Sequence, residues 1–172
     1  MARIRQDHFN LQKYPATYKI YLKKEKDFIL KLLRPTDRIL DVGCGIGRLI
    51  PEIAPRVRYY TGIDNEKLYI RKAKILAAQY RNAKVLLLDA HKLSKKFKSG
   101  EFDTVISTWN TVGCVSDDRT VLEEMTKIAR RNIIFSVVAK GSLQRRIEYY
   151  NKLRIKYRAD KKTEAIYSKE WG

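Results

Sequence analysis

The chain has 172 residues, 44% of them apolar and 33% charged, with a net charge of +18. This length fits one domain with a hydrophobic core, and the apolar content excludes a disordered chain. No run approaches the roughly 18–20 apolar residues that a membrane span needs. The basic segment 1–15 has no apolar stretch behind it, so no signal peptide is expected. Two cysteines at unrelated positions predict neither a disulfide framework nor a metal site, and a cytoplasmic location follows.

The positive charge leaves two interpretations open. A basic protein attracts anions, which makes nucleic acid or an acidic substrate a candidate partner. Lysine and arginine are also spread over nearly every expected helix, where they usually mark solvated faces. Abundant Lys, Arg, Ile and Tyr are in addition typical of a thermophile.

Short apolar runs alternate along the chain with charged segments of helical period. In chain order we expect a helix over 16–33, a strand over 38–42, a short helix through Leu49 and Ile53 that Pro55 bounds, and a strand over 57–63. A helix that Asp64 and Asn65 cap follows, then a buried strand over 84–88 and a strand over 102–108. The remaining elements are a helix that Asp117 or Asp118 caps, a strand over 132–139, a helix opened by Gly141 and Ser142, and a short hairpin around 160–163.

This alternation predicts a single α/β domain with a doubly wound, mostly parallel sheet and helices on both faces. Residues 1–35 form a helical cap, residues 36–139 a cofactor-binding core, and residues 140–172 a helix and hairpin. Ligands of such sheets bind beyond the carboxyl ends of the strands. Four residues fall at these ends, namely Gly43, Asp64, Asp89 and Thr108.

A glycine-rich segment, Asp-Val-Gly-Cys-Gly-Ile-Gly over 41–47, follows the first strand. A dinucleotide site needs the spacing G-x-G-x-x-G, but here the third glycine comes one residue early, at Gly47, and Arg48 stands where it would be. The acidic Asp41 two places before the first glycine would repel a pyrophosphate. It suits a ligand that carries an ammonium group and a sulfonium.

The pattern Asp-x-Gly-x-Gly-x-Gly, with acidic residues ending the next two strands, resembles the class I S-adenosylmethionine-dependent methyltransferases, over roughly 30–138. This resemblance implies S-adenosyl-L-methionine as the cofactor and S-adenosyl-L-homocysteine as the product. It implies that Asp64 holds the ribose hydroxyls, and that Asp89 and the Ala90 amide face the adenine. The full expected cofactor set is Asp41, Gly43, Cys44, Gly45, Gly47, Asp64, Asn65, Asp89, Ala90, Ser107, Thr108 and Tyr18.

Several of these residues have a plainer interpretation. Asp64 can cap a helix, and Asp89 can be a turn residue. Cys44 is expected to matter through its backbone. The tyrosines near Tyr18, namely Tyr14 and Tyr21, either close over the cofactor or only pack a helix.

The expected activity is in-line methyl transfer to an unidentified acceptor, with His91, Asn110 and Trp109 as the catalytic candidates. His91 can accept a proton or be a surface loop residue, and Trp109 can line the substrate pocket or belong to the core. Methylation of base amino groups in this family uses an Asn/Asp-Pro-Pro-Tyr/Phe motif, and the chain instead has Ser-Thr-Trp-Asn at 107–110. A small-molecule acceptor is therefore favoured, with RNA second.

The carboxyl end departs from the family, whose members continue through two more strands. Segments 155–158 and 164–168 supply these strands in shortened form, or the sheet stays incomplete and leaves an edge for a partner chain and an oligomer. Two other functions stay open: a cofactor-binding module without its own chemistry, and a basic nucleic-acid-binding domain.

Overall fold

We analysed a computed structural model of the chain, which describes residues 10–168. Residues 1–9, part of the amino-terminal segment in which no signal peptide was expected, and residues 169–172 lie outside this description. The contacts within the chain divide it into two compact units. We call Glu25–Val137 the core unit, and Met1–Lys24 with Val138–Gly172 the flanking unit.

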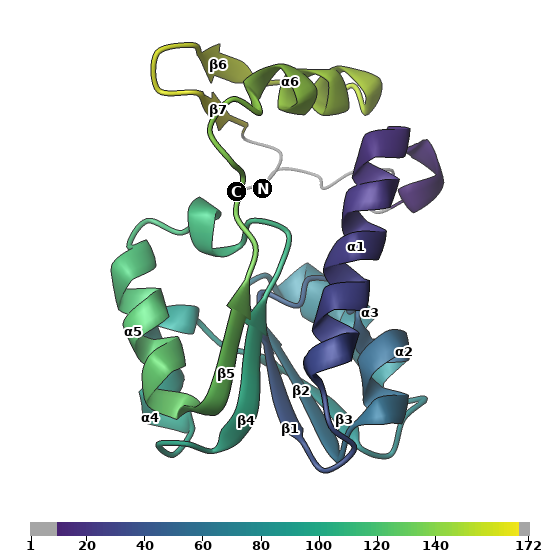
Figure 1. Cartoon of the computed structure of the whole chain (residues 1–172), viewed down its shortest axis with the longest axis vertical. Coiled ribbons are helices and arrows are strands. Elements are labelled where there is room, and N and C mark those ends of the chain that lie inside the picture. The colour runs from purple at the N-terminus through teal and green to yellow at the C-terminus, as the bar shows by residue number, and fades with distance from the viewer. Residues whose placement is uncertain (1–9, 169–172) are drawn as a thin grey trace. The chain divides into compact units, whose positions relative to one another are not determined.

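The core unit is built on a five-stranded, fully parallel sheet in the order β3-β2-β1-β4-β5 (Figure 1). Its strands are β1 Arg38–Val42, β2 Tyr59–Asp64, β3 Ala83–Leu87, β4 Phe102–Ser107 and β5 Ala129–Phe135. The order reverses between β1 and β4: the strands that follow β1 in the chain, β2 and β3, lie on one side of this pair, and β5, which follows β4, lies on the other. The predicted doubly wound α/β fold is confirmed.

Helices cover both faces of this sheet (Figure 1). One face carries α2 Ile50–Ile53, α3 Lys67–Ala77 and the second half of α1 Ala16–Leu32, and the other carries α4 Leu93–Lys96 and α5 Asp118–Ile128. Because side chains alternate along a strand, Ile39 packs into the first core and its neighbour Leu40 into the second. Both residues are fully buried.

The predicted ends of the helices are confirmed in part. The helix α3 is capped by Glu66, whose side chain accepts a hydrogen bond from the Leu68 amide, so the prediction that Asp64 or Asn65 caps it was wrong. The short helix α2 ends at Ile53, before Pro55 as predicted, and Pro55 lies inside a 3-10 turn, Ala54–Arg56. The Asp117 cap of α5 is confirmed by its bond from the Thr120 amide.

The two outer strands are less buried than their apolar sequences predict. The strand β3 lies at one edge of the sheet, and Leu87 in it is 54% exposed. The prediction of a fully buried strand there was wrong, because an apolar run does not tell a central strand from an edge strand. The strand β5 at the other edge begins three residues earlier than expected.

The flanking unit contains the helix α6 Leu143–Lys152 and a hairpin of β6 Arg158–Asp160 and β7 Ala165–Tyr167. Its interior is built from tyrosines: Tyr149 stacks on Tyr18 with 4.4 Å between ring centroids and meets Tyr14 edge-on at 5.2 Å. The carbonyl of Glu164 in the hairpin turn accepts a hydrogen bond from Arg146, which ties α6 to the hairpin.

The hairpin expected around 160–163 is confirmed, but its strands pair only with each other. The alternative that segments 155–158 and 164–168 extend the main sheet was therefore wrong. The five-stranded sheet ends at β5, whose residues Ile133 and Phe135 line a groove of about 270 Å³ together with Phe28 and Leu32 of α1.

In residues 10–168 no helix is long and apolar enough to cross a membrane.

Candidate functional site

The glycine loop leaves β1 next to the point where the strand order reverses, the usual place for a ligand in such sheets. Gly43, Gly45 and Gly47 have φ values of +75°, +56° and +89°, a left-handed conformation that side chains disfavour. The amides of Gly43 and Cys44 both donate to the carbonyl of Ile63 at 2.9 Å. The loop is thus pinned to the end of β2, and its shape requires glycine.

The three glycines differ in what surrounds them. A methyl group on Gly43 would lie 2.3 Å from the Thr111 side chain, and one on Gly47 would lie 2.6 Å from Ile50. A methyl group on Gly45 would meet nothing within 4 Å. Gly43 and Gly47 therefore serve close packing within the protein, whereas Gly45 borders open space that a ligand can occupy.

Asp64 at the end of β2 lies beside this open position. Its Oδ2 accepts a hydrogen bond from the Gly45 amide at 2.9 Å, and its Oδ1 accepts one from the Glu66 amide at 2.9 Å. Burial raises the pKa of Asp64 above its ordinary value, while these amides act in the other direction. Each carboxylate oxygen has a second lone pair, so the group can still accept two hydroxyl hydrogen bonds, as a ribose diol requires.

Asp41 lies beneath the loop, inside β1, and is only 2% exposed. Its Oδ2 accepts a hydrogen bond from the Tyr60 hydroxyl at 2.6 Å, and its Oδ1 is buried without a hydrogen-bond partner in the described structure. Burial raises the pKa of Asp41 to about 6, although the Tyr60 bond and Arg48 lower it. Near neutral pH the loop therefore covers a buried carboxylate, one oxygen of which accepts no hydrogen bond in the described structure.

The residues after β3 form a small polar cluster. Asp89 opens a 3-10 turn that contains Ala90, and its Oδ1 accepts from the His91 amide and lies 2.7 Å from His91 Nδ1. The His91 bonds hold the pKa of Asp89 below its usual range. The pKa of Asp117 is also lowered, mainly by hydrogen bonds from Thr120 and to a smaller extent by the side chain of His91.

Two other predicted cofactor residues differ in burial. Asn65 is exposed, and Cys44 is buried under the glycine loop, where desolvation raises the pKa of its thiol strongly. A protonated thiol is a poor nucleophile, so Cys44 serves as a filler.

Trp109 and Asn110 follow β4 and both adopt a left-handed backbone, with φ values of +58° and +63°. Such a pair of non-glycine residues is strained, and strain of this kind concentrates at functional sites. The Trp109 amide donates to Ser136 Oγ at 3.0 Å, and the Asn110 amide donates to the Ser136 carbonyl at 3.1 Å. The structure thus places both catalytic candidates on a loop held to the end of β5, next to the buried Ser107 and Thr108.

A buried charge cluster that the sequence did not indicate supports this loop. Glu25 of α1 has a side chain only 5% exposed, and its Oε2 pairs with Arg48 at 2.6 Å. Its Oε1 accepts from Ser136 Oγ at 2.6 Å and from the Trp109 amide at 3.2 Å. Arg48 also reaches Thr108 Oγ1 at 3.3 Å. One carboxylate therefore joins the segments after β1, β4 and β5.

Not every predicted site residue belongs to this unit. Tyr18 lies in the flanking unit, where one ring face stacks on Tyr149 and burial raises its pKa to about 12. Its role as a lid over the cofactor stays a prediction. Within residues 10–168 no group of three or more His, Cys, Asp or Glu side chains is arranged to hold a metal ion.

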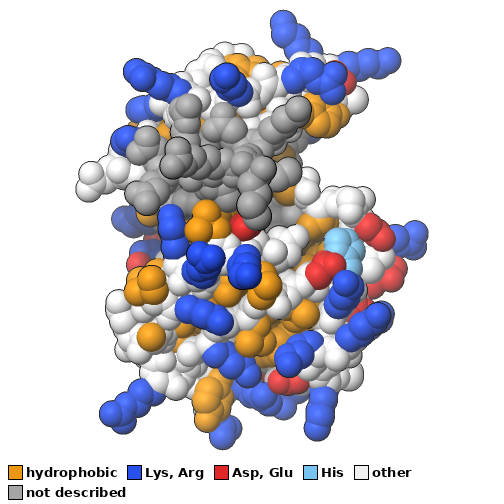
Figure 2. Space-filling view, turned by 180° about the vertical axis from the view of Figure 1, so that it is seen from behind, with side chains coloured by type: hydrophobic (Ala, Val, Ile, Leu, Met, Phe, Trp, Pro, Cys, Tyr) orange, Lys and Arg blue, Asp and Glu red, His pale blue; other side chains and the backbone are white. Residues whose placement is uncertain are grey.

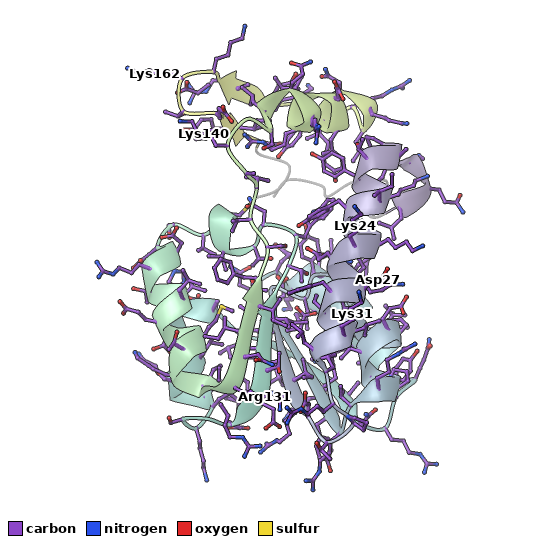
Figure 3. All side chains as sticks on the ribbon, in the orientation of Figure 1. Lys24, Asp27, Lys31, Arg131, Lys140 and Lys162 are labelled. Carbon is purple, nitrogen blue, oxygen red and sulfur yellow. The ribbon has the colours of Figure 1, made fainter. Side chains whose placement is uncertain are left out.

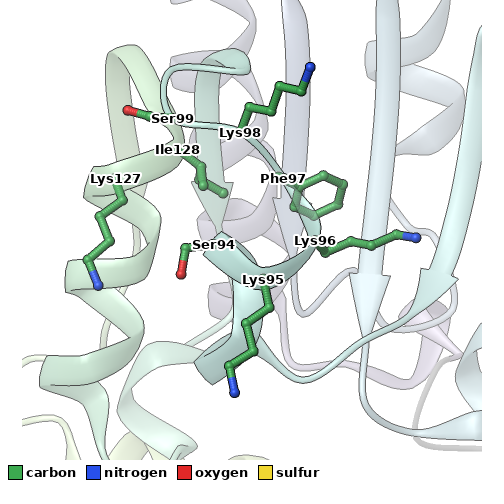
Figure 4. Close-up of a pocket in the computed structure, with 8 residues that line it drawn as sticks. All are labelled: Ser94, Lys95, Lys96, Phe97, Lys98, Ser99, Lys127 and Ile128. Atoms are coloured by element: carbon green, nitrogen blue, oxygen red, sulfur yellow. The ribbon is translucent and has the colours of Figure 1, made fainter.

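A separate hollow of about 580 Å³ lies near the start of β4, at the opposite end of the sheet from the glycine loop. It is bordered by Lys95, Lys96 and Lys98 and by the end of α5 at Ile128 (Figure 4). Ser94 at its side is already bonded to the Glu124 carboxylate, at 2.7 and 2.9 Å. The hollow thus has no part in the loop chemistry.

Comparison with known proteins agrees with this geometry. A family model described as a methyltransferase domain matches residues 33–168. An uncharacterized methyltransferase of Mycobacterium tuberculosis is 31% identical over 101 residues, which is 58% of this chain and 49% of the relative. The matched chain thus spans about half the length of that relative.

Two solved structures share the fold. The PH0226 protein of Pyrococcus horikoshii superposes with a TM-score of 0.68 at 21% identity, covering 90% of this chain and 72% of that one. A phosphoethanolamine N-methyltransferase of Haemonchus contortus, solved with phosphoethanolamine and S-adenosylhomocysteine, has a TM-score of 0.57 at 20% identity and covers 69% of this chain and 25% of that one. The resemblance in the motifs is confirmed: the chain belongs to the methyltransferase-domain family, with the class I Rossmann-like fold.

Proposed function

We propose that this chain binds S-adenosylmethionine at the loop over residues 41–47 and transfers its methyl group to an acceptor by in-line displacement. The observation that carries the proposal is the open space at Gly45, bordered by the Asp64 carboxylate. When bound, the cofactor supplies a methyl group on a sulfonium, and the leaving group is neutral. The protein then has to position the acceptor and exclude water, and need not stabilise an anion at the sulfur.

Asp64 is the proposed ribose ligand, because its carboxylate lies beside the open position at Gly45 and can accept hydrogen bonds from hydroxyl groups there. Asp89 and the Ala90 amide are the proposed adenine contacts, since they follow the next parallel strand at the same edge of the sheet. Asp41 is buried directly beneath the loop and would add negative charge under a cationic cofactor.

The loop with Trp109 and Asn110 is the proposed wall for the acceptor. Its amides are fixed by Glu25 and Ser136, so its position does not depend on the acceptor being present. Glu25 is a positioning residue, because both of its oxygens already accept hydrogen bonds and it pairs with Arg48. Where the acceptor must lose a proton, His91 is the candidate base, with Asp89 at 2.7 Å to stabilise its charged form.

The comparisons support the cofactor more than the acceptor. The Haemonchus contortus methyltransferase with the same fold was solved with S-adenosylhomocysteine. Its acceptor, phosphoethanolamine, is a small molecule, the class that the absent Asn/Asp-Pro-Pro motif also favours.

Calorimetry with S-adenosylmethionine tests the cofactor site. The unaltered chain should bind, and Asp64→Ala should lose at least tenfold in affinity, since two charge-assisted hydrogen bonds are removed. Glu123→Gln is the control, because Glu123 is an exposed carboxylate of α5 that pairs with Arg119 on the helix surface, away from the glycine loop in the chain. A chain that shows no binding would end the proposal.

Incubation with methyl-labelled cofactor and separate pools of small metabolites and RNA tests the transfer. Label should enter one pool with the unaltered chain and fail to enter it with Asp64→Ala. Binding without label in any pool would instead favour a cofactor-binding subunit that needs a partner.

A further inference from the structure

The positive charge is unevenly divided between the two units. The flanking unit, about a third of the chain, has 16 Lys and Arg against 5 Asp and Glu, a net +11. The core unit has 21 against 14, a net +7. Most of the net charge of +18 therefore lies outside the core unit.

A thermophilic composition does not explain this division, since it enriches Lys and Glu together. In the core unit several basic side chains pair with buried acids, as Arg131 does with Asp37. In the flanking unit two of the acids accept hydrogen bonds from the backbone: Asp160 accepts from the Lys162 and Thr163 amides, and Glu164 accepts from the Gly141 amide at 2.6 Å. Basic residues thus outnumber acidic ones by 16 to 5 in this unit.

The hairpin combines this charge with an exposed aromatic ring. Arg158 and Tyr167 face each other across β6 and β7, with the guanidinium carbon 4.9 Å from the ring centroid. Tyr167 is 51% exposed. Lys161 and Lys162 occupy the turn, and Lys162 extends outward from it (Figure 3). Proteins that bind single strands combine basic side chains, which attract the phosphates, with aromatic rings on which bases stack, and the hairpin offers both.

The same unit is poorly suited to a membrane surface. A helix that lies in a bilayer needs a free apolar face. The apolar side of α6 is instead covered, because Tyr149 and its neighbour Leu153 are buried within the unit. Lys and Arg side chains project from the part of the molecule that carries α6 and the hairpin, among uncharged and apolar atoms (Figure 2). Phosphates of a nucleic acid fit this surface better than lipid does.

We propose that the flanking unit is a docking surface for single-stranded nucleic acid. In it Arg158, Lys161 and Lys162 contact the phosphates, and Tyr167 stacks on a base. This inference concerns binding alone, so it goes beyond methyl transfer and does not depend on it. Where both hold, the strand that docks here is the first acceptor to test.

Fluorescence anisotropy of the full chain with a labelled 12-nucleotide RNA, at several salt concentrations, tests the inference. Replacing Arg158, Lys161 and Lys162 together by Gln should weaken binding at least tenfold. It should also reduce the slope of log affinity against log salt by about 2, because three phosphate contacts on a single strand are lost. Tyr167→Ala should weaken binding about tenfold with the slope unchanged, and Tyr167→Phe should bind normally.

The matched control replaces Lys95, Lys96 and Lys98 of the core unit by Gln, which removes the same charge from the border of the hollow in that unit. Equal losses in the two triple variants would overturn the inference, since binding would then follow total charge. Absence of binding at low salt, or tighter binding to phosphatidylserine vesicles than to the oligonucleotide, would overturn it too. A DNA strand of the same sequence distinguishes RNA from DNA, and thermal melting verifies that each variant is folded.

Discussion

The carboxylate of Glu25 lies 2.6 Å from the guanidinium of Arg48, and this pair joins the helix before the sheet to the segment just after the glycine loop. The same carboxylate binds the hydroxyl of Ser136, 111 residues away in the chain. A single buried side chain thus holds together the three segments that border the proposed methyl-transfer site.

Glu25→Gln should lower the free energy of unfolding by about 2 kcal/mol, because it leaves the partly buried Arg48 without its counter-charge. Urea unfolding measures this loss. Glu52→Gln removes the more exposed pair with Lys26 and should cost less than about 1 kcal/mol. Equal losses in the two variants would show that the Glu25 pair behaves as an ordinary surface ion pair.

Asp41→Asn should make the protein more stable at pH 7 and weaken its cofactor binding. The pKa of Asp41 is raised from 3.8 to about 6 by burial, so the unfolded chain releases this proton at lower pH than the folded protein does. The unaltered protein therefore loses stability as the pH rises from about 4 to 6. The gain in the variant should reach about 3 kcal/mol above pH 6 and vanish below pH 4.

Urea unfolding at pH 4, 5 and 7 measures this dependence, with the exposed Asp118→Asn as the control. A gain of the same size at every pH would contradict the assigned role of Asp41.

Gly45→Ala should abolish cofactor binding while the protein stays folded. The methyl group meets no protein atom within 4 Å but occupies the open position, and the left-handed backbone costs about 1 kcal/mol. Gly100→Ala has a similar φ of +62° and only an ordinary contact at 3.9 Å, so it should cost about the same stability and bind normally. Calorimetry measures cofactor binding by both variants and thermal melting measures their stability, so the two together distinguish backbone strain from a blocked ligand position. Normal binding by Gly45→Ala would place the ligand elsewhere.

Glu124→Gln should destabilise the contact between α4 and α5, and the effect should fade in acid. Burial alone would raise the pKa of Glu124, but bonds from Lys127 and Ser94 outweigh it and lower the pKa to about 2. The carboxylate therefore stabilises the fold above about pH 4.5, and this contribution is lost as the pH falls towards 2.

After allowance for solvent screening we expect a loss of about 1 kcal/mol at pH 7. Unfolding at pH 7 and pH 3 measures it. A loss that grows in acid would contradict the ion-pair explanation.

The sequence by itself predicted the succession of helices and strands along the chain, the class of fold and the glycine loop. These depend on local features: the period of apolar residues, the glycines that a left-handed loop requires, and acids at strand ends. The structure places Asp64 beside the open position at Gly45. The assignments of individual cofactor and catalytic residues remain predictions.

Only the tertiary structure decided three further features. Edge position made β3 half-exposed, and no property of an apolar run reports which neighbours a strand has. The hairpin β6–β7 stayed separate from the main sheet, because pairing depends on contacts between distant segments. Glu25 stands among lysines in a sequence that reads as a solvated helix face, and long-range packing alone brings it to Arg48 and Ser136. Local physics thus determined the elements and the loop, whereas contacts between segments far apart in the chain decided which side chains support the site.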